Sequence, residues 1–142
     1  MAFLHKLFGV RPPAADPLRK PGEKLQSFMR PSLAMVDARD LTIPLKRRRL
    51  AQFAYGALER LGQRYELDET QILAVLVVYL QGMSGSHPQE VSTLVGSCVQ
   101  LADDPGGQRF AQRGAAAMEQ WLSGDAGTAV QALAVSFAED PA

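Results

Sequence analysis

Few side chains in this sequence of 142 residues combine a type and a spacing that could do chemistry. His87 and Glu90 have the i, i+3 spacing that places two metal ligands on one face of a helix. A metal site needs three or four ligands, and the only other histidine is His5. Four further carboxylates are available as ligands or proton carriers: Asp37, Asp40, Asp103 and Asp104. Because these residues form no recognised ligand set, we expect capping or surface roles for them, and no bound metal or other cofactor.

The nucleophile candidates are equally isolated. Cys98 lies among apolar residues at helical spacing, which indicates a buried structural thiol without the neighbouring base that a nucleophile needs. Ser84 and Ser86 flank a glycine but form no G-x-S-x-G motif, and Asp103 and Asp104 beside Gly106-Gly107 would repel a phosphate. Dinucleotide, Walker, paired CxxC and HExxH motifs are absent from the sequence. A non-enzymatic protein is therefore expected, while an enzyme whose site assembles from separate loops stays an alternative.

A basic cluster is the strongest charge feature of the sequence. Its members are Lys46, Arg47, Arg48, Arg49, Arg60 and Arg64. Four cations at the start of a helix oppose the helix dipole, at a cost of roughly 0.3–1 kcal/mol each when exposed, so compensating charge is expected. Arg49, Arg60 and Arg64 lie along one edge of the apolar stripe of the predicted helix. Gly56 lies on the same side and leaves room for a partner to approach closely. Two readings follow: a ridge that binds nucleic acid or another anionic surface, or pairing with acidic groups of this protein.

The distribution of charge favours internal pairing. The chain has 15 Lys and Arg and 15 Asp and Glu, but residues 1–66 carry 13 basic and 6 acidic residues, a net charge of +7. Residues 67–142 carry 2 basic and 9 acidic residues, a net charge of −7. Because the two halves match in magnitude, we expect the basic cluster to find its counter-charge in the C-terminal half, within or between copies.

The N-terminus is the second candidate contact region. As a helix it would present Phe3, Leu4, Leu7 and Phe8 on one side. Residues 9–22 contain four prolines and two glycines, and they predict a linker between this amphipathic segment (1–22 in all) and one helical domain, 23–142. Two turns bury too little for membrane anchoring alone, so we expect docking to a protein partner, including exchange between copies. The alternative is that the segment folds back on its own domain.

Apolar spacing predicts a compact all-α array, orthogonal or bundle-like, with about five helices after residue 43. A short helix near 22–30 and an extended arm come first. The strongest pattern, 44–66, predicts an amphipathic helix with Gln52, Glu59 and Gln63 on its solvent side. Residues 70–81, capped by Asp68 and Gln71, read as a central helix, although 72–80 would also suit a buried strand. Further helices are expected at about 88–102, 105–123 and 128–138.

These features predict a non-enzymatic helical interaction or regulatory module that self-associates. The longest apolar run, 72–80, has nine residues, well short of the roughly 20 that a transmembrane helix needs. The N-terminus also lacks the features of a signal peptide, which are a basic region, an apolar run and a cleavage site with small residues, in that order. With one cysteine and no pattern of disulfides, a reducing, cytoplasmic setting is expected.

Overall fold

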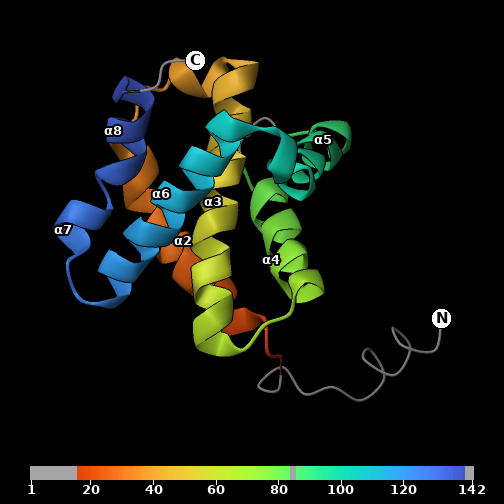
Figure 1. Ribbon diagram of the computed structural model, residues 1–142, viewed down its shortest axis with the longest axis vertical. Helices are drawn as coiled ribbons and strands as arrows, with labels where there is room; N and C mark the ends of the chain where they lie inside the picture. Colours follow the sequence, from red (N-terminus) through yellow and green to blue (C-terminus); the bar gives the residue numbers. More distant parts are fainter. Residues whose placement is uncertain (1–15, 84–85, 140–142) are drawn as a thin grey trace.

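A computed structural model describes residues 16–83 and 86–139, and all of its regular structure there is helical, which confirms the all-α prediction. Figure 1 shows a compact array in which helices cross at large angles. The helices are α2 (Arg19–Ala34), α3 (Pro44–Tyr65), α4 (Glu69–Gln81), α5 (Pro88–Val99), α6 (Pro105–Leu122), α7 (Ala126–Ala129) and α8 (Ala132–Glu139), with 3-10 turns η2 (Asp40–Thr42) and η3 (Leu101–Asp103).

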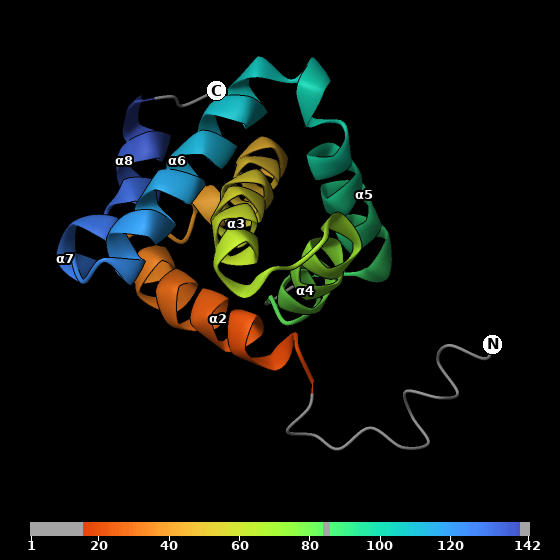
Figure 2. The same ribbon diagram turned by 60° about the horizontal axis from the view of Figure 1, so that its bottom comes forward.

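Helix α3 forms the centre of the fold. Figure 2, which looks nearly along its axis, shows α2, α4, α5 and α6 arranged around it. All residues from Leu50 to Leu58 are buried, so this stretch has no solvent-facing side. The prediction of one buried stripe with Gln52 exposed is therefore wrong, since a helix enclosed by four others buries positions all round its axis. Glu59 and Gln63, beyond this stretch, are exposed as predicted.

Two glycines bring α3 and α6 into backbone contact. A Cβ atom added at Gly56 would lie 1.8 Å from the carbonyl oxygen of Ala111, and one added at Gly114 would lie 2.0 Å from that of Phe53. Each glycine therefore faces the backbone of the other helix, and this crossing depends on the absence of both side chains. The room that the sequence indicates at Gly56 is filled by α6 and is not open to a partner.

Helix α2 differs from its prediction. It does not end near residue 30 but continues through Pro31 to Ala34, and residues 19–22, which were expected in the linker, form its first turn. Its inward face extends across the proline from Phe28 to Ser32, whose hydroxyl donates to the Phe28 carbonyl at 2.8 Å. Core burial on both sides of Pro31 holds the helix together despite the backbone hydrogen bond that proline lacks.

Helix α4 is a helix and not a strand, and it begins as the sequence predicts. The Asp68 carboxylate accepts from the Gln71 amide at 2.8 Å, and the Gln71 side chain accepts from the Asp68 amide at 2.9 Å. The expectation that α4 is central is wrong, because only one side of it packs on the core, at Ile72, Val75, Leu76, Tyr79 and Leu80. Its opposite side, which includes Ala74 and Val78, is exposed.

The C-terminal helix is divided. One helix was predicted over 128–138, whereas α7 ends at Ala129 and α8 starts at Ala132. Asp125 caps α7, accepting from the Thr128 amide. The Gln131 amide then bonds to the Thr128 carbonyl three residues back, which tightens and ends the turn. Gly127, a weak helix former, favours so short a helix.

Candidate interaction surface

Three arginines of the basic cluster have acidic partners far along the chain. The Arg47 guanidinium bonds both oxygens of the Glu90 carboxylate, with Nη2 2.9 Å from Oε1, and also donates to the Leu41 carbonyl. Arg60 pairs with Glu119 on α6. A third pair joins Arg49 Nη1 to Asp104 at 2.7 Å. These contacts provide the internal counter-charge that the segregated sequence predicts.

Asp104 is the centre of a small polar network. Its carboxylate accepts from Arg49, from the amide of the buried Gln52 at 2.9 Å and from the Gly107 backbone amide at 3.0 Å, the last as the cap of α6. Partial desolvation is the largest single influence and raises the pKa of Asp104, but these hydrogen bonds together outweigh it and lower the pKa from 3.8 to about 2. The network thus stabilises an ionised carboxylate, and it explains how Gln52 is tolerated inside the protein.

The remaining cations do not form a continuous ridge. Lys46 pairs with Asp40 at 2.8 Å. Arg48 and Arg64 are exposed and make no ion pair within the described residues. They lie 16 positions apart on α3, a separation of about 24 Å at 1.5 Å per residue. An anionic partner would therefore meet two distant free cations and not a row of six.

Two of the candidate carboxylates meet at one hollow. Asp37, Asp40, Lys46 and Phe137 line a hollow of about 330 Å³ between η2 and α8. The Arg39 side chain and amide hydrogen-bond Asp37 and lower its pKa from 3.8 to about 2, while Lys46 holds Asp40. A carboxylate held so strongly ionised is a poor general acid or base near neutral pH, so this hollow does not favour proton-transfer chemistry.

The other chemical candidates also have structural positions. Cys98 is buried, and desolvation raises the pKa of its thiol to about 12, so the reactive thiolate is disfavoured. His87 is the N-cap residue of α5, but its side chain makes no capping hydrogen bond. Glu90 is committed to Arg47. Within residues 16–83 and 86–139, no three metal-ligating side chains gather at one point.

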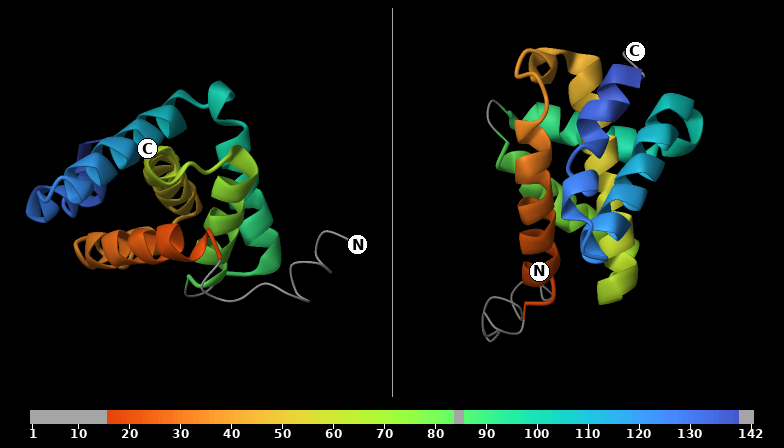
Figure 3. Two further views of the ribbon diagram at one scale, coloured as in Figure 1. Left: turned by 90° about the horizontal axis from the view of Figure 1, so that it is seen from below. Right: turned by 90° about the vertical axis from the view of Figure 1, so that its left-hand side faces the viewer.

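A groove between α2 and α4 has an apolar wall on α4 and a largely polar wall on α2. We call it the α2–α4 groove; it has a volume of about 710 Å³. Its α4 wall includes Ala74 and Val78, and Val78 is 68% exposed. The left view of Figure 3 shows the beginning of α2 meeting α4 at one corner of the molecule. Asp16, the first described residue, lies on the rim of this groove.

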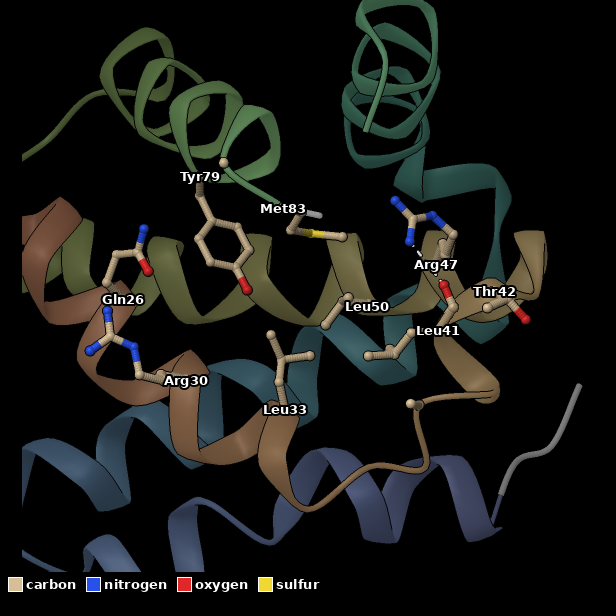
Figure 4. A pocket seen from close by; sticks show the side chains of 11 residues that line it. Gln26, Arg30, Leu33, Leu41, Thr42, Arg47, Leu50, Tyr79 and Met83 are labelled. Carbon is tan, nitrogen blue, oxygen red and sulfur yellow. Dashed lines mark hydrogen bonds between the residues drawn. The ribbon is translucent and has the colours of Figure 1, made fainter. Parts of the chain in front are cut away.

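A second hollow adjoins this groove. We call it the Tyr79 hollow; it has a volume of about 490 Å³ and is bounded by α2, η2 and the end of α4 (Figure 4). Gln26, Arg30 and Tyr79 line both it and the groove. The sequence pattern revealed neither site, because both depend on which side of α4 faces outward. The only signal was the apolar character of α4 on all sides, which was taken as a sign of complete burial.

The predicted docking residues Phe3, Leu4, Leu7 and Phe8 lie outside the described residues. Asp16 shows, however, where their chain enters the described structure.

Comparison with known proteins finds no matching family model, no matching curated protein and no matching solved structure. Among the described helices, none has both the length and the apolar character that crossing a bilayer requires.

Proposed function

We propose that this protein is a non-enzymatic helical interaction module that self-associates when the N-terminal apolar segment (residues 3–8) of one copy docks into the α2–α4 groove of another. The observation that carries this proposal is the uncovered apolar wall of α4. Val78 is 68% exposed there, at the same groove where the described chain begins. Exposed apolar walls rimmed by polar side chains are typical of docking sites for apolar segments.

The apolar side of the segment matches the α4 wall of the groove. Phe3, Leu4, Leu7 and Phe8 present one apolar side at helical spacing. Burying such side chains contributes roughly 1.5–3 kcal/mol each, or about 6–12 kcal/mol for four. Association costs on the order of 4–15 kcal/mol in lost freedom, which is comparable to this gain. Weak, concentration-dependent self-association is therefore expected.

The linker favours exchange between copies. Residues 9–15 span at most roughly 25 Å when extended. Because Asp16 lies on the rim of the groove, however, residues 3–8 can dock in the groove of the same chain only if residues 9–15 bend back toward it. Pro12 and Pro13 favour extended backbone for themselves and for the residue before them, and this opposes a reversal. Hinges that resist folding back promote the exchange of a segment between copies.

A charged side chain in the groove should disrupt self-association. We expect the mass of the full chain, 15.4 kDa as a monomer, to rise with concentration in sedimentation equilibrium. Val78→Asp places a carboxylate on the docking wall and should weaken association at least tenfold. Val99→Asp is the matched control, because Val99 is similarly exposed (61%) but lies on α5, outside the groove.

Two results would contradict this proposal: a mass of 15.4 kDa at every concentration, or equal weakening by Val78→Asp and Val99→Asp.

A further inference from the structure

The Tyr79 hollow has a polar end on α2 and an apolar stretch next to it. Figure 4 shows Gln26 and Arg30, one turn apart on α2, on one side of the Tyr79 ring. On the other side of the ring lie aliphatic and thioether side chains, those of Leu33, Leu41, Leu50 and Met83, with Arg47 and Thr42 beyond them. A volume of about 490 Å³ lies within the range of small-molecule sites. The hollow therefore has the polarity of a site for an elongated amphiphile.

The Tyr79 hydroxyl lacks a partner inside this hollow. Tyr79 is 6% exposed, and its hydroxyl oxygen is buried without a hydrogen bond. Figure 4 shows the side chain reaching from α4 across the hollow toward α2. Buried hydroxyl groups almost always have a partner, so an unpaired one is an exception that requires an explanation. A ligand group that accepts its hydrogen bond would provide that partner.

The charge at this hollow favours an anion. Arg30 is exposed, lines the hollow and makes no ion pair or hydrogen bond within the described chain. Arg47, the other cation there, is neutralised by Glu90. None of the described residues that line the hollow is acidic. One free guanidinium and one amide, on Gln26, are thus available for a planar acid group, which a guanidinium binds with two parallel hydrogen bonds.

We infer that the Tyr79 hollow binds a linear amphiphile with one carboxylate, such as a medium-chain fatty acid. Arg30 and Gln26 donate hydrogen bonds to the carboxylate, and the Tyr79 hydroxyl donates a third. The alkyl tail lies against Leu33, Leu41 and Leu50. Val78, the residue that tests self-association, lines the α2–α4 groove but not this hollow, although Gln26, Arg30 and Tyr79 line both.

Calorimetric titration of the full chain with dodecanoate, below the concentration at which it forms micelles, tests the inference. Dodecyltrimethylammonium has the same tail and a cationic head, so it controls for binding through the tail alone. We expect dodecanoate to bind at least tenfold more tightly, and Arg30→Gln to remove this preference. Arg64→Gln, which removes an exposed unpaired cation elsewhere on the surface, should leave dodecanoate binding unchanged. Absence of dodecanoate binding, or equal binding of the two amphiphiles, would overturn the inference.

Tyr79→Phe separates a ligand contact from a purely structural role. Removing an unpaired buried hydroxyl should raise the melting temperature of the ligand-free protein. The same change should weaken dodecanoate binding severalfold, because the carboxylate loses a donor. If the variant were folded but bound dodecanoate as tightly as the natural chain, the proposed contact would be wrong.

Discussion

Gly114→Ala should destabilise this protein by about 3–5 kcal/mol, a large fraction of the stability of a small domain. The added Cβ would lie 2.0 Å from the carbonyl oxygen of Phe53 and 2.8 Å from its carbonyl carbon. Backbone atoms in the middle of α3 cannot rotate aside as a side chain can. The two helices must therefore move apart, which loosens the packing at the centre of the core.

The sign of this effect makes the prediction specific. Alanine is a better helix former than glycine by about 1 kcal/mol, so propensity alone predicts stabilisation. Gly96→Ala on α5 is the matched control, because a Cβ there meets nothing within 4 Å, and it should stabilise by up to about 1 kcal/mol. Urea denaturation of both variants measures the difference. Equal effects of the two substitutions would show that α3 and α6 do not cross in backbone contact.

Asp104→Asn should lower the free energy of unfolding by about 2–3 kcal/mol at pH 7. The lowered pKa of Asp104, 3.8 to about 2, corresponds to roughly 2 kcal/mol. This figure is reduced because the side chain is 24% exposed. Asparagine also leaves Arg49 without its counter-charge and replaces an acceptor of the buried Gln52, which adds a further cost of about 1 kcal/mol.

The pH dependence of stability tests whether the ionised form of Asp104 is the one that stabilises the protein. Because the pKa of Asp104 is lower in the folded state, its contribution is complete above about pH 4 and is lost as the pH falls toward 2. The gap between the natural chain and Asp104→Asn should therefore close over this interval in urea denaturation. Asp37→Asn is a useful control, since that carboxyl has a similarly lowered pKa but its partner Arg39 is exposed, and it should change stability much less. A gap that persists unchanged to pH 2 would contradict the assignment.

Local signals in the sequence predicted most of the helices. The capping box at Asp68, the cap at Asp104 and the start of α3 at Pro44 are set by neighbouring residues, and they occur in the structure as predicted. Helix α2 was predicted too short because Pro31 disfavours a helix locally, whereas the burial that carries α2 past it is tertiary. The break between α7 and α8 at Val130 likewise has no clear pattern in the local sequence.

The surfaces were less predictable because they depend on which helix the others pack around. Both α3 and α4 contain long apolar stretches, and the sequence does not say which of them the others surround. The structure buries α3 all round and leaves Val78 of α4 exposed, which reverses the expected roles. Charge segregation correctly predicted C-terminal partners for Arg47, Arg49 and Arg60. It did not predict the Asp40 partner of Lys46 or the bond between Asp104 and Gln52. The apolar side of residues 3–8 could be recognised from sequence, although the groove proposed to receive it could not.

The central claim is that residues 3–8 of one copy occupy the α2–α4 groove of another, and disulfide trapping between copies tests it most directly. A copy carrying Leu7→Cys is mixed with a differently tagged copy carrying Val78→Cys under mild oxidation. Cys98 is buried and does not compete. We predict a mixed disulfide in severalfold higher yield than with Val99→Cys, the similarly exposed control outside the groove. Equal yields with the two partners, or a single chain carrying both substitutions that closes its own disulfide when diluted, would contradict the exchange of this segment.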